Sequence, residues 1–284
     1  MVKLNNSVWR YIVVLFILTY IVQIFAILNG GEDSALFPFF IGCTMLFPGI
    51  GAIIYLIKTK QGLKFINWRI GKPIFILLSL ILPSIITLGG IFLFEKIGWG
   101  VNNAYSFIDG KANNIDIPLF LGTNEQSFSF FLFNFLITGI GYSLLTGILT
   151  IGEEIGWRGF LQKKLLEKNS ILKSIIFLGI IWGFWHFPLI VTGFNYPEYP
   201  FLGAFLIFPL STIFISFFIG WLTINSKSFW PAVFAHGGIN SIMIFLFELD
   251  FGERKLEANF IILGIWIFIG VLSYILISNK TGTN

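Results

Sequence analysis

The sequence predicts an all-α fold, a polytopic bundle of about eight transmembrane helices in a single integral membrane domain covering residues 1–284. Hydrophobic residues make up 56% of the chain and charged residues only 11%, too few to form the polar shell of a soluble domain. The apolar residues also gather in long runs. Runs of about 20 residues let an α-helix cross roughly 30 Å of hydrocarbon.

Eight apolar runs define the expected spans. They cover residues 8–28, 36–57, 73–95, 130–151, 172–192, 201–224, 229–248 and 258–278. The first run is longer than the core of a signal peptide and shows no small-residue cleavage pattern, so we expect it to be retained as a helix. Residues 96–127, between the third and fourth runs, contain the Gly, Asn and Asp typical of a loop.

The basic residues predict the orientation of these spans. With eight spans and both termini in the cytoplasm, 14 of the 18 lysines and arginines fall on one side and 11 of the 14 acidic residues on the other. This distribution follows the positive-inside rule, which seven or nine spans would break. We therefore expect a multi-pass protein of the cell membrane, in contact with the lipid bilayer. The same distribution accounts for the basic net charge, so no nucleic acid partner is predicted.

Charged residues within the spans cluster in the second half of the chain. A charge held in hydrocarbon is costly, so such residues are functional candidates. The first cluster contains Glu153, Glu154 and Arg158. Glu154 and Arg158 can pair on one helix face, whereas Glu153 points about 100° away around the helix and is free for another role. Taken alone, the cluster equally fits a cytoplasmic helix end with solvated charges.

The two histidines define the other clusters. His186 lies within the fifth span, and His236 lies four residues before Asn240 in the seventh. Counted from the nearest cytoplasmic lysine, Glu153, His186 and His236 all lie roughly 14 to 20 Å along their helices. A lone histidine in a membrane helix is more often a hydrogen-bonded packing residue. The shared depth nevertheless favours one enclosed site.

Small residues accompany each cluster and predict close packing of these helices. They are Gly152 and Gly156, Gly179 and Gly183, and Gly237 and Gly238. Glycines spaced in this way let helix backbones approach and bring polar side chains together.

These side chains could hydrolyse a peptide bond. A carboxylate and an imidazole, such as Glu153 and His186, can hold and deprotonate a water molecule. His236 and Asn240 can donate hydrogen bonds to the oxyanion that forms when water attacks an amide carbonyl. A metal site with Glu153, His186 and His236 as ligands and water as the fourth ligand is the alternative. The chain has no HExxH pair that would support zinc independently.

The order EExxxR, aromatic-xxx-His and HxxxN on late membrane helices resembles the CAAX protease and bacteriocin-processing family of intramembrane glutamic endopeptidases. The resemblance covers residues 130–245, which we interpret as the catalytic core. It implies that Glu153 is the catalytic glutamate that activates water together with His186. It further implies that His236 and Asn240 form the oxyanion hole.

The resemblance also implies supporting residues and a mechanism without a cofactor. Glu154 and Arg158 would orient the helix, and a metal-independent reaction is expected, with the three-ligand metal site as the alternative. The family usually has Phe four residues before the second motif's histidine, where this chain has Trp182, and the difference concerns pocket shape. Trp157, Trp182 and Trp185 are the aromatic residues that we expect to bind substrate.

We therefore expect an intramembrane endopeptidase that cuts a membrane-associated peptide or protein near the cytoplasmic leaflet. Eukaryotic members of the family remove the tripeptide after a prenylated cysteine, and prokaryotic members are linked to peptide maturation and bacteriocin immunity. Two alternatives stay open. A proton-coupled transporter would also bury ionisable residues, although the sequence shows no repeat of broken helices. A non-catalytic membrane immunity or binding protein would need no catalytic set.

Overall fold

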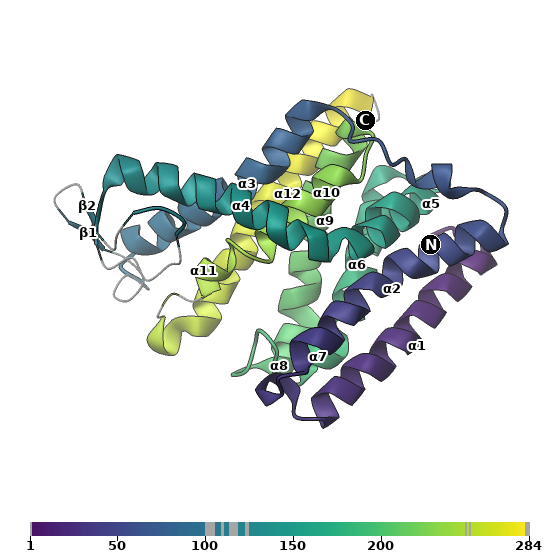
Figure 1. The fold of residues 1–284 in the computed structure, drawn as a ribbon, viewed down its shortest axis with the longest axis horizontal. Coiled ribbons are helices and arrows are strands. Elements are labelled where there is room, and N and C mark those ends of the chain that lie inside the picture. Colours follow the sequence, from purple (N-terminus) through teal and green to yellow (C-terminus); the bar gives the residue numbers. More distant parts are fainter. Residues whose placement is uncertain are drawn as a thin grey trace.

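The computed structural model describes residues 2–99, 106–108, 111–113, 119–122, 125–247, 249 and 251–281 as a bundle of helices (Figure 1). Among the described residues, seven helices are long and apolar enough to cross a membrane. The prediction of a polytopic all-α bundle is thus confirmed. The segment expected as the fifth span is the one that does not form such a helix.

The α-helices are α1 (Asn6–Leu28), α2 (Phe37–Lys58), α3 (Pro73–Lys96), α4 (Phe128–Glu154), α5 (Gln162–Leu166), α6 (Ile171–Trp185), α7 (Phe187–Val191), α8 (Pro200–Leu202), α9 (Phe208–Ser226), α10 (Trp230–Ile239), α11 (Ile244–Phe247) and α12 (Lys255–Thr281). Two π-helical segments, Ile155–Leu161 and Gly203–Ile207, follow α4 and α8. Short 3₁₀ turns cover Gly31–Asp33, Leu63–Ile66 and Gly252–Arg254.

The region expected as a loop between α3 and α4 contains three short strands that the sequence does not predict. They are β1 (Ser106–Ile108), β2 (Lys111–Asn113) and β3 (Gln126–Ser127), paired antiparallel in the order β1-β2-β3. The sheet lies at the end of the bundle where α4 begins (Figure 1).

Prolines and serines fix where several helices begin. Pro38, Pro73, Pro188, Pro209 and Pro231 each occupy one of the first two positions of a helix, where the missing backbone N–H is not needed. At the starts of α4 and α6, the side chains of Ser127 and Ser170 accept hydrogen bonds from backbone N–H groups three residues later. These signals anchor the helices that carry the charged motifs.

The expected fifth span is divided at His186 into α6 and α7. Pro188 explains the break, because it has no N–H to donate to the carbonyl of Phe184 and its ring crowds that turn of the helix. The hydroxyl of Tyr20 on α1 donates to this carbonyl instead, at 2.6 Å. The break leaves α6 with 15 residues and places His186 at a bend between two helices.

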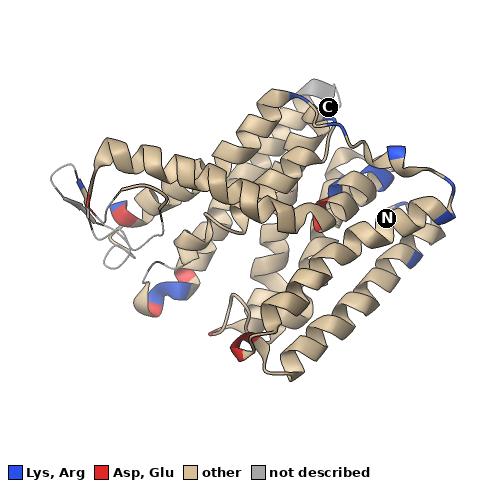
Figure 2. Ribbon diagram, viewed as in Figure 1, with Lys and Arg blue, Asp and Glu red and all other residues tan. Residues whose placement is uncertain are grey.

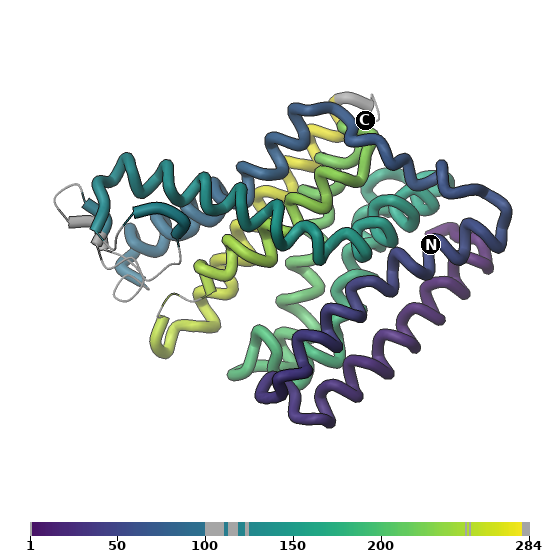
Figure 3. The backbone as a smooth tube through the Cα atoms, in the orientation of Figure 1, coloured from purple at the N-terminus to yellow at the C-terminus, as the bar shows by residue number. Residues whose placement is uncertain are grey.

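Glycines let α4 approach its neighbours on both sides, as Figure 3 traces along the backbone. A Cβ atom on Gly152 would lie 2.6 Å from the carbonyl oxygen of Met45 on α2. One on Gly237 of α10 would lie 2.5 Å from the backbone nitrogen of Gly147 on α4. Such approaches require residues without side chains. The close packing predicted from the glycine pairs is therefore present, and it brings α2, α4 and α10 together.

Charged side chains lie mainly at helix ends and connections, with long uncharged helical stretches between them (Figure 2). Blue lysines and arginines gather near the N-terminus, the C-terminal end of α2 and α5, and the acidic Glu32 and Asp33 lie at the opposite end of α1 and α2. This arrangement is the one that the positive-inside rule describes. The cytoplasmic location of both termini stays a prediction.

Gly156 offers a test of this packing. A Cβ atom at this position would collide with the side chain and backbone of Pro48 on α2, so we expect Gly156→Ala to lower the free energy of unfolding by about 1–3 kcal/mol. Gly89→Ala on α3 is the matched control, because nothing lies within 4 Å of its added methyl group. Unfolding in mixed detergent micelles measures both, and equal stability of the two variants would contradict the packing.

Candidate active site

A cavity of about 400 Å³ lies between helices from both halves of the chain. Glu153 from the end of α4, His186 from the bend between α6 and α7, and Asn240 from the end of α10 all line it. The remaining lining is largely apolar, with side chains from α1, α2, α9, α11 and α12. Three residues that the sequence analysis selected from separate motifs therefore meet at one cavity.

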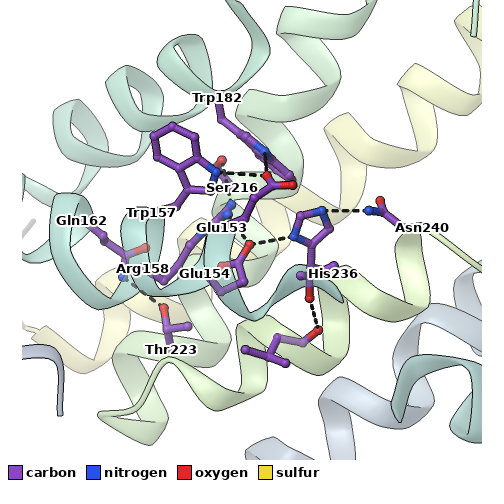
Figure 4. Close-up of polar contacts among 12 residues, drawn as sticks. Glu153, Glu154, Trp157, Arg158, Gln162, Trp182, Ser216, Thr223, His236 and Asn240 are labelled. Carbon is purple, nitrogen blue, oxygen red and sulfur yellow. Dashed lines mark hydrogen bonds and ion pairs between the residues drawn. The ribbon is translucent and has the colours of Figure 1, made fainter. Parts of the chain in front are cut away.

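The carboxylate of Glu153 is held by two tryptophans. Its Oε2 atom accepts hydrogen bonds from Trp157 Nε1 at 3.1 Å and from Trp182 Nε1 at 2.9 Å (Figure 4). The side chain is only 1% exposed. Charge-assisted bonds of this kind fix the orientation of a carboxylate. Its second oxygen accepts no hydrogen bond from the described residues, so it can contact a ligand in the cavity.

The local helix geometry helps to place this carboxylate. Directly after Glu154 the α-helix widens into the π-helical segment Ile155–Leu161, a form that occurs often at functional sites. Trp157 lies within this segment, four residues after Glu153, and its indole reaches back to the carboxylate. No sequence pattern predicts this change of helix type.

Three tryptophans, Trp157, Trp182 and Trp185, are expected from the sequence to bind substrate, and the structure places one of them at the cavity. Trp185 lines the cavity, and its indole N–H donates to Thr19 on α1 at 2.8 Å. Trp157 and Trp182 are not among the lining residues, because their indole N–H groups turn toward Glu153 behind the cavity wall. Trp182 occupies the position where the resembling family usually has Phe, and it adds a hydrogen-bond donor there.

Behind the cavity, Glu154 contacts a cationic side chain, Arg158, and a titratable one, His236. Its Oε1 atom accepts from Arg158 Nη1 and lies 2.8 Å from His236 Nδ1 (Figure 4). The structure therefore contains the pair expected from the spacing of Glu154 and Arg158, and it adds His236 from α10. All three side chains are buried. Buried charges require such partners, since desolvation is costly.

Arg158 connects this network to Trp182, one of the two tryptophans that donate to Glu153. Its guanidinium lies 4.4 Å from the ring centroid of Trp182, a cation–π distance, and its Nη2 donates to Ser216 on α9 at 3.3 Å. Glu154 Oε2 and Arg158 Nε have no hydrogen-bond partner among the described residues. Arg158 thus donates to Glu154 and stacks on Trp182, whose indole donates to Glu153.

His236 and Asn240 contact each other at the end of α10. A carboxylate can only accept, so His236 donates its Nδ1 proton to Glu154 and its neutral Nε2 accepts from Asn240 Nδ2 at 3.1 Å. Asn240 lines the cavity, whereas His236 is not among the lining residues. The second amide N–H of Asn240 remains for a ligand, and His236 holds the amide in place.

His186 has a defined tautomer. Its Nδ1 atom lies 2.9 Å from the carbonyl oxygen of Trp182, which can only accept, so the proton is on Nδ1. The ring packs edge-on against Trp185 and Phe208, with centroids 4.6 and 5.0 Å away. Nε2 is then an acceptor that can take a hydrogen bond from water in the cavity.

The metal alternative requires Glu153, His186 and His236 to converge on one point. Within the part of the chain that the structure describes, no group of three or more His, Cys, Asp or Glu side chains is arranged to hold a metal ion. His236 directs one ring nitrogen to Glu154 and the other to Asn240. Its nitrogens are therefore engaged within the protein.

Several residues around the site were missed by the sequence analysis. Ser216 accepts from Arg158, Thr19 accepts from Trp185, and Gln23 lines the cavity. Thr19 and Gln23 stand four residues apart in an otherwise apolar run, and this spacing on one helix face was the signal that could have identified them. No pattern in the sequence marks Ser216.

Comparison with known proteins relates this region to a family of proteases. Residues 124–242 match the family model described as type II CAAX prenyl endopeptidase Rce1-like. The chain is also 37% identical over 92 residues to CAAX prenyl protease 2 of Methanococcus maripaludis. That alignment covers 31% of this chain and 34% of the relative, so it spans about a third of the relative's length. The segment that matches the family model, residues 124–242, contains all the motif residues.

Proposed function

We propose that this chain, whose residues 124–242 match the family model of the Rce1-like CAAX prenyl endopeptidases, is an intramembrane endopeptidase that uses a glutamate-activated water. The observation that carries the proposal is the convergence of Glu153, His186 and Asn240 on one cavity. These side chains supply a base, a second water ligand and an oxyanion donor. For Glu153, His186 and Asn240 these are the roles that the family resemblance implies.

The first step is attack by water on the scissile carbonyl carbon. Water bound between Glu153 and His186 Nε2 donates one hydrogen to each, and Glu153 takes the proton as the new C–O bond forms. The carbonyl π electrons move to the oxygen and give a tetrahedral oxyanion. When this intermediate collapses, the C–N bond breaks and the proton passes from Glu153 to the leaving nitrogen. The products are a carboxylic acid and an amine, which ionise to a carboxylate and an ammonium when the remaining water proton passes to the amine, and the protein is unchanged.

The oxyanion is stabilised from the opposite wall of the cavity. The N–H of Asn240 that is not bonded to His236 donates to it, in surroundings where few polar groups compete. His236 acts as a positioning residue, because Glu154 fixes its tautomer and its Nε2 fixes the amide. Direct donation by His236, the role expected from the resemblance, would require a change in this pairing.

The substrate that we propose is a membrane-associated peptide or protein, cut near the cytoplasmic leaflet. The apolar lining of the cavity suits a substrate segment delivered from the bilayer. The similarity to CAAX prenyl protease 2 supports a substrate with a prenylated cysteine. A role in peptide maturation or bacteriocin immunity would fit the same chemistry.

The test is cleavage by the purified chain in detergent micelles, followed by mass spectrometry. The substrates are a farnesylated peptide ending in Cys-Val-Ile-Met, the same peptide without the lipid, and a pool of bacterial membrane peptides. We expect hydrolysis at one bond, fastest with the lipidated peptide. Cleavage that a chelator leaves unchanged supports the metal-independent mechanism, and loss with chelator would support the metal site. Absence of cleavage, with proton flux in liposomes, would favour a transporter.

Trp182→Phe should separate the two functions of this tryptophan. The substitution keeps a ring against Arg158 but removes the N–H that donates to Glu153, so we expect kcat to fall about tenfold with little loss of stability. Trp230→Phe is the control, because it also removes an indole hydrogen bond, to the Trp68 carbonyl, away from the cavity. An unchanged kcat in Trp182→Phe would show that this donor does not assist the reaction.

A further inference from the structure

Gln23 is a buried polar residue in a helix outside the segment that matches the protease family. The inward face of α1 is formed by Val8, Tyr11, Ile12, Leu15, Thr19, Gln23 and Ala26. Gln23 is fully buried there and lines the same cavity as Glu153 and His186. An amide within a membrane helix needs an explanation, since leucine would pack at this position without desolvating a polar group.

Contacts one turn earlier fix α1 against the site. Thr19 Oγ1 accepts from the indole of Trp185, which borders His186. The hydroxyl of Tyr20 donates to the carbonyl of Phe184, at the place where Pro188 interrupts the helix. Because residues four apart share a helix face, the anchored Thr19 directs Gln23 toward the same cavity.

The side-chain amide of Gln23 makes no hydrogen bond to the residues that the structure describes. Neither Oε1 nor Nε2 has a hydrogen-bond partner among the described residues, although both atoms are buried. Most buried polar side chains in proteins are hydrogen-bonded, so an unpaired amide in a side chain that lines a cavity indicates a ligand. A primary amide offers one acceptor and one donor side by side. This pattern is complementary to the N–H and C=O of one residue in an extended backbone, which point to the same side.

We propose that Gln23 binds the backbone N–H and C=O of one extended substrate residue next to the scissile bond, and so aligns the peptide. The proposal rests on the proposed endopeptidase function and adds how the chain holds an extended peptide against the catalytic residues. The Gln23 side chain accepts a hydrogen bond from the N–H of that residue and donates one to its C=O. Recognition is then of the peptide backbone and not of a particular side chain.

An ester scan tests this assignment. The probe is the farnesylated peptide ending in Cys-Val-Ile-Met, made as a series in which each non-scissile amide in turn becomes an ester, which removes the N–H. With the wild-type protein we expect kcat/KM to fall about tenfold at one position near the scissile bond. Gln23→Leu should cleave the all-amide peptide about tenfold less efficiently and lose no further efficiency with that ester.

Gln162→Leu is the matched control. Gln162 is also a buried glutamine, but it donates to Thr223 and does not line the cavity, so this variant should keep the wild-type ester profile. Gln23→Met, closer in shape to glutamine, should repeat the result of Gln23→Leu. If Gln23 had only a structural role, its variants would cleave every peptide of the series less efficiently by the same factor. They would then keep the position-specific ester penalty.

The outcomes separate this inference from the proposed function. If the wild type cleaves and Gln23→Leu and Gln23→Met keep the position-specific ester penalty, Gln23 does not bind the backbone and the inference is wrong while the function stands. If the wild type cleaves no member of the series, the endopeptidase function fails for this substrate class and the inference falls with it. Loss of the penalty in both variants, with Gln162→Leu unchanged, supports the assignment.

Discussion

Glu153→Gln is expected to lower kcat by about 100- to 10,000-fold, the range that general base catalysis contributes. The carboxamide oxygen can still accept from Trp157 and Trp182, so the side chain should keep its place. It cannot take a proton from water. We therefore expect KM to change little, and steady-state kinetics in detergent measure both parameters.

Glu167→Gln is the matched control for this experiment. Glu167 follows the same helical segment and pairs with Lys164, but it is partly exposed and does not line the cavity. Its kcat should equal that of the wild type. A Glu153→Gln protein that cleaves at the wild-type rate would mean that another group activates the water.

Arg158→Met is expected to cause the largest loss of stability. The change removes the cationic partner of Glu154 and leaves a carboxylate buried beside His236, in a network whose three side chains are at most 2% exposed. Breaking one side of a buried ion pair costs about 3–5 kcal/mol. Unfolding in mixed micelles should show a loss of that size, together with loss of activity.

A second substitution tests whether the unpaired charge is the cause. In the double variant Arg158→Met and Glu154→Gln no buried carboxylate remains at this position, so part of the stability should return. Lys168→Met, which removes an exposed cation bonded to Asn5, should leave stability almost unchanged. If Arg158→Met unfolds like the wild type, the network does not stabilise the fold.

The long apolar runs predicted most of the fold because membrane spans leave a direct record in composition. The expected first span, 8–28, corresponds to α1 at Asn6–Leu28, and 73–95 corresponds to α3 at Pro73–Lys96. The fifth span was predicted as continuous although Pro188 was visible within it. Hydropathy carries no information on backbone hydrogen-bond donors. The break at His186 can be predicted only from the N–H that Pro188 lacks and from the bulk of its ring.

The site was predictable where its residues carry charge within apolar runs. Glu153 and His186 stood out for that reason, and the structure brings both to one cavity. The partners of these residues were not predictable in the same way. The bond from His236 to Glu154 joins residues 82 positions apart, and nothing in the sequence distinguishes Glu154 from Glu153 as the acceptor. That choice depends on how α4 and α10 pack through Gly237.

The most direct measurement is peptide hydrolysis in water enriched in oxygen-18, in the presence of chelator, by the wild type and by Glu153→Gln. We expect the wild type to release two fragments from the farnesylated peptide, with one heavy oxygen in the new carboxylate, and Glu153→Gln to release almost none. Equal product from both proteins, or product only when a metal is restored, would contradict a metal-independent reaction that depends on Glu153.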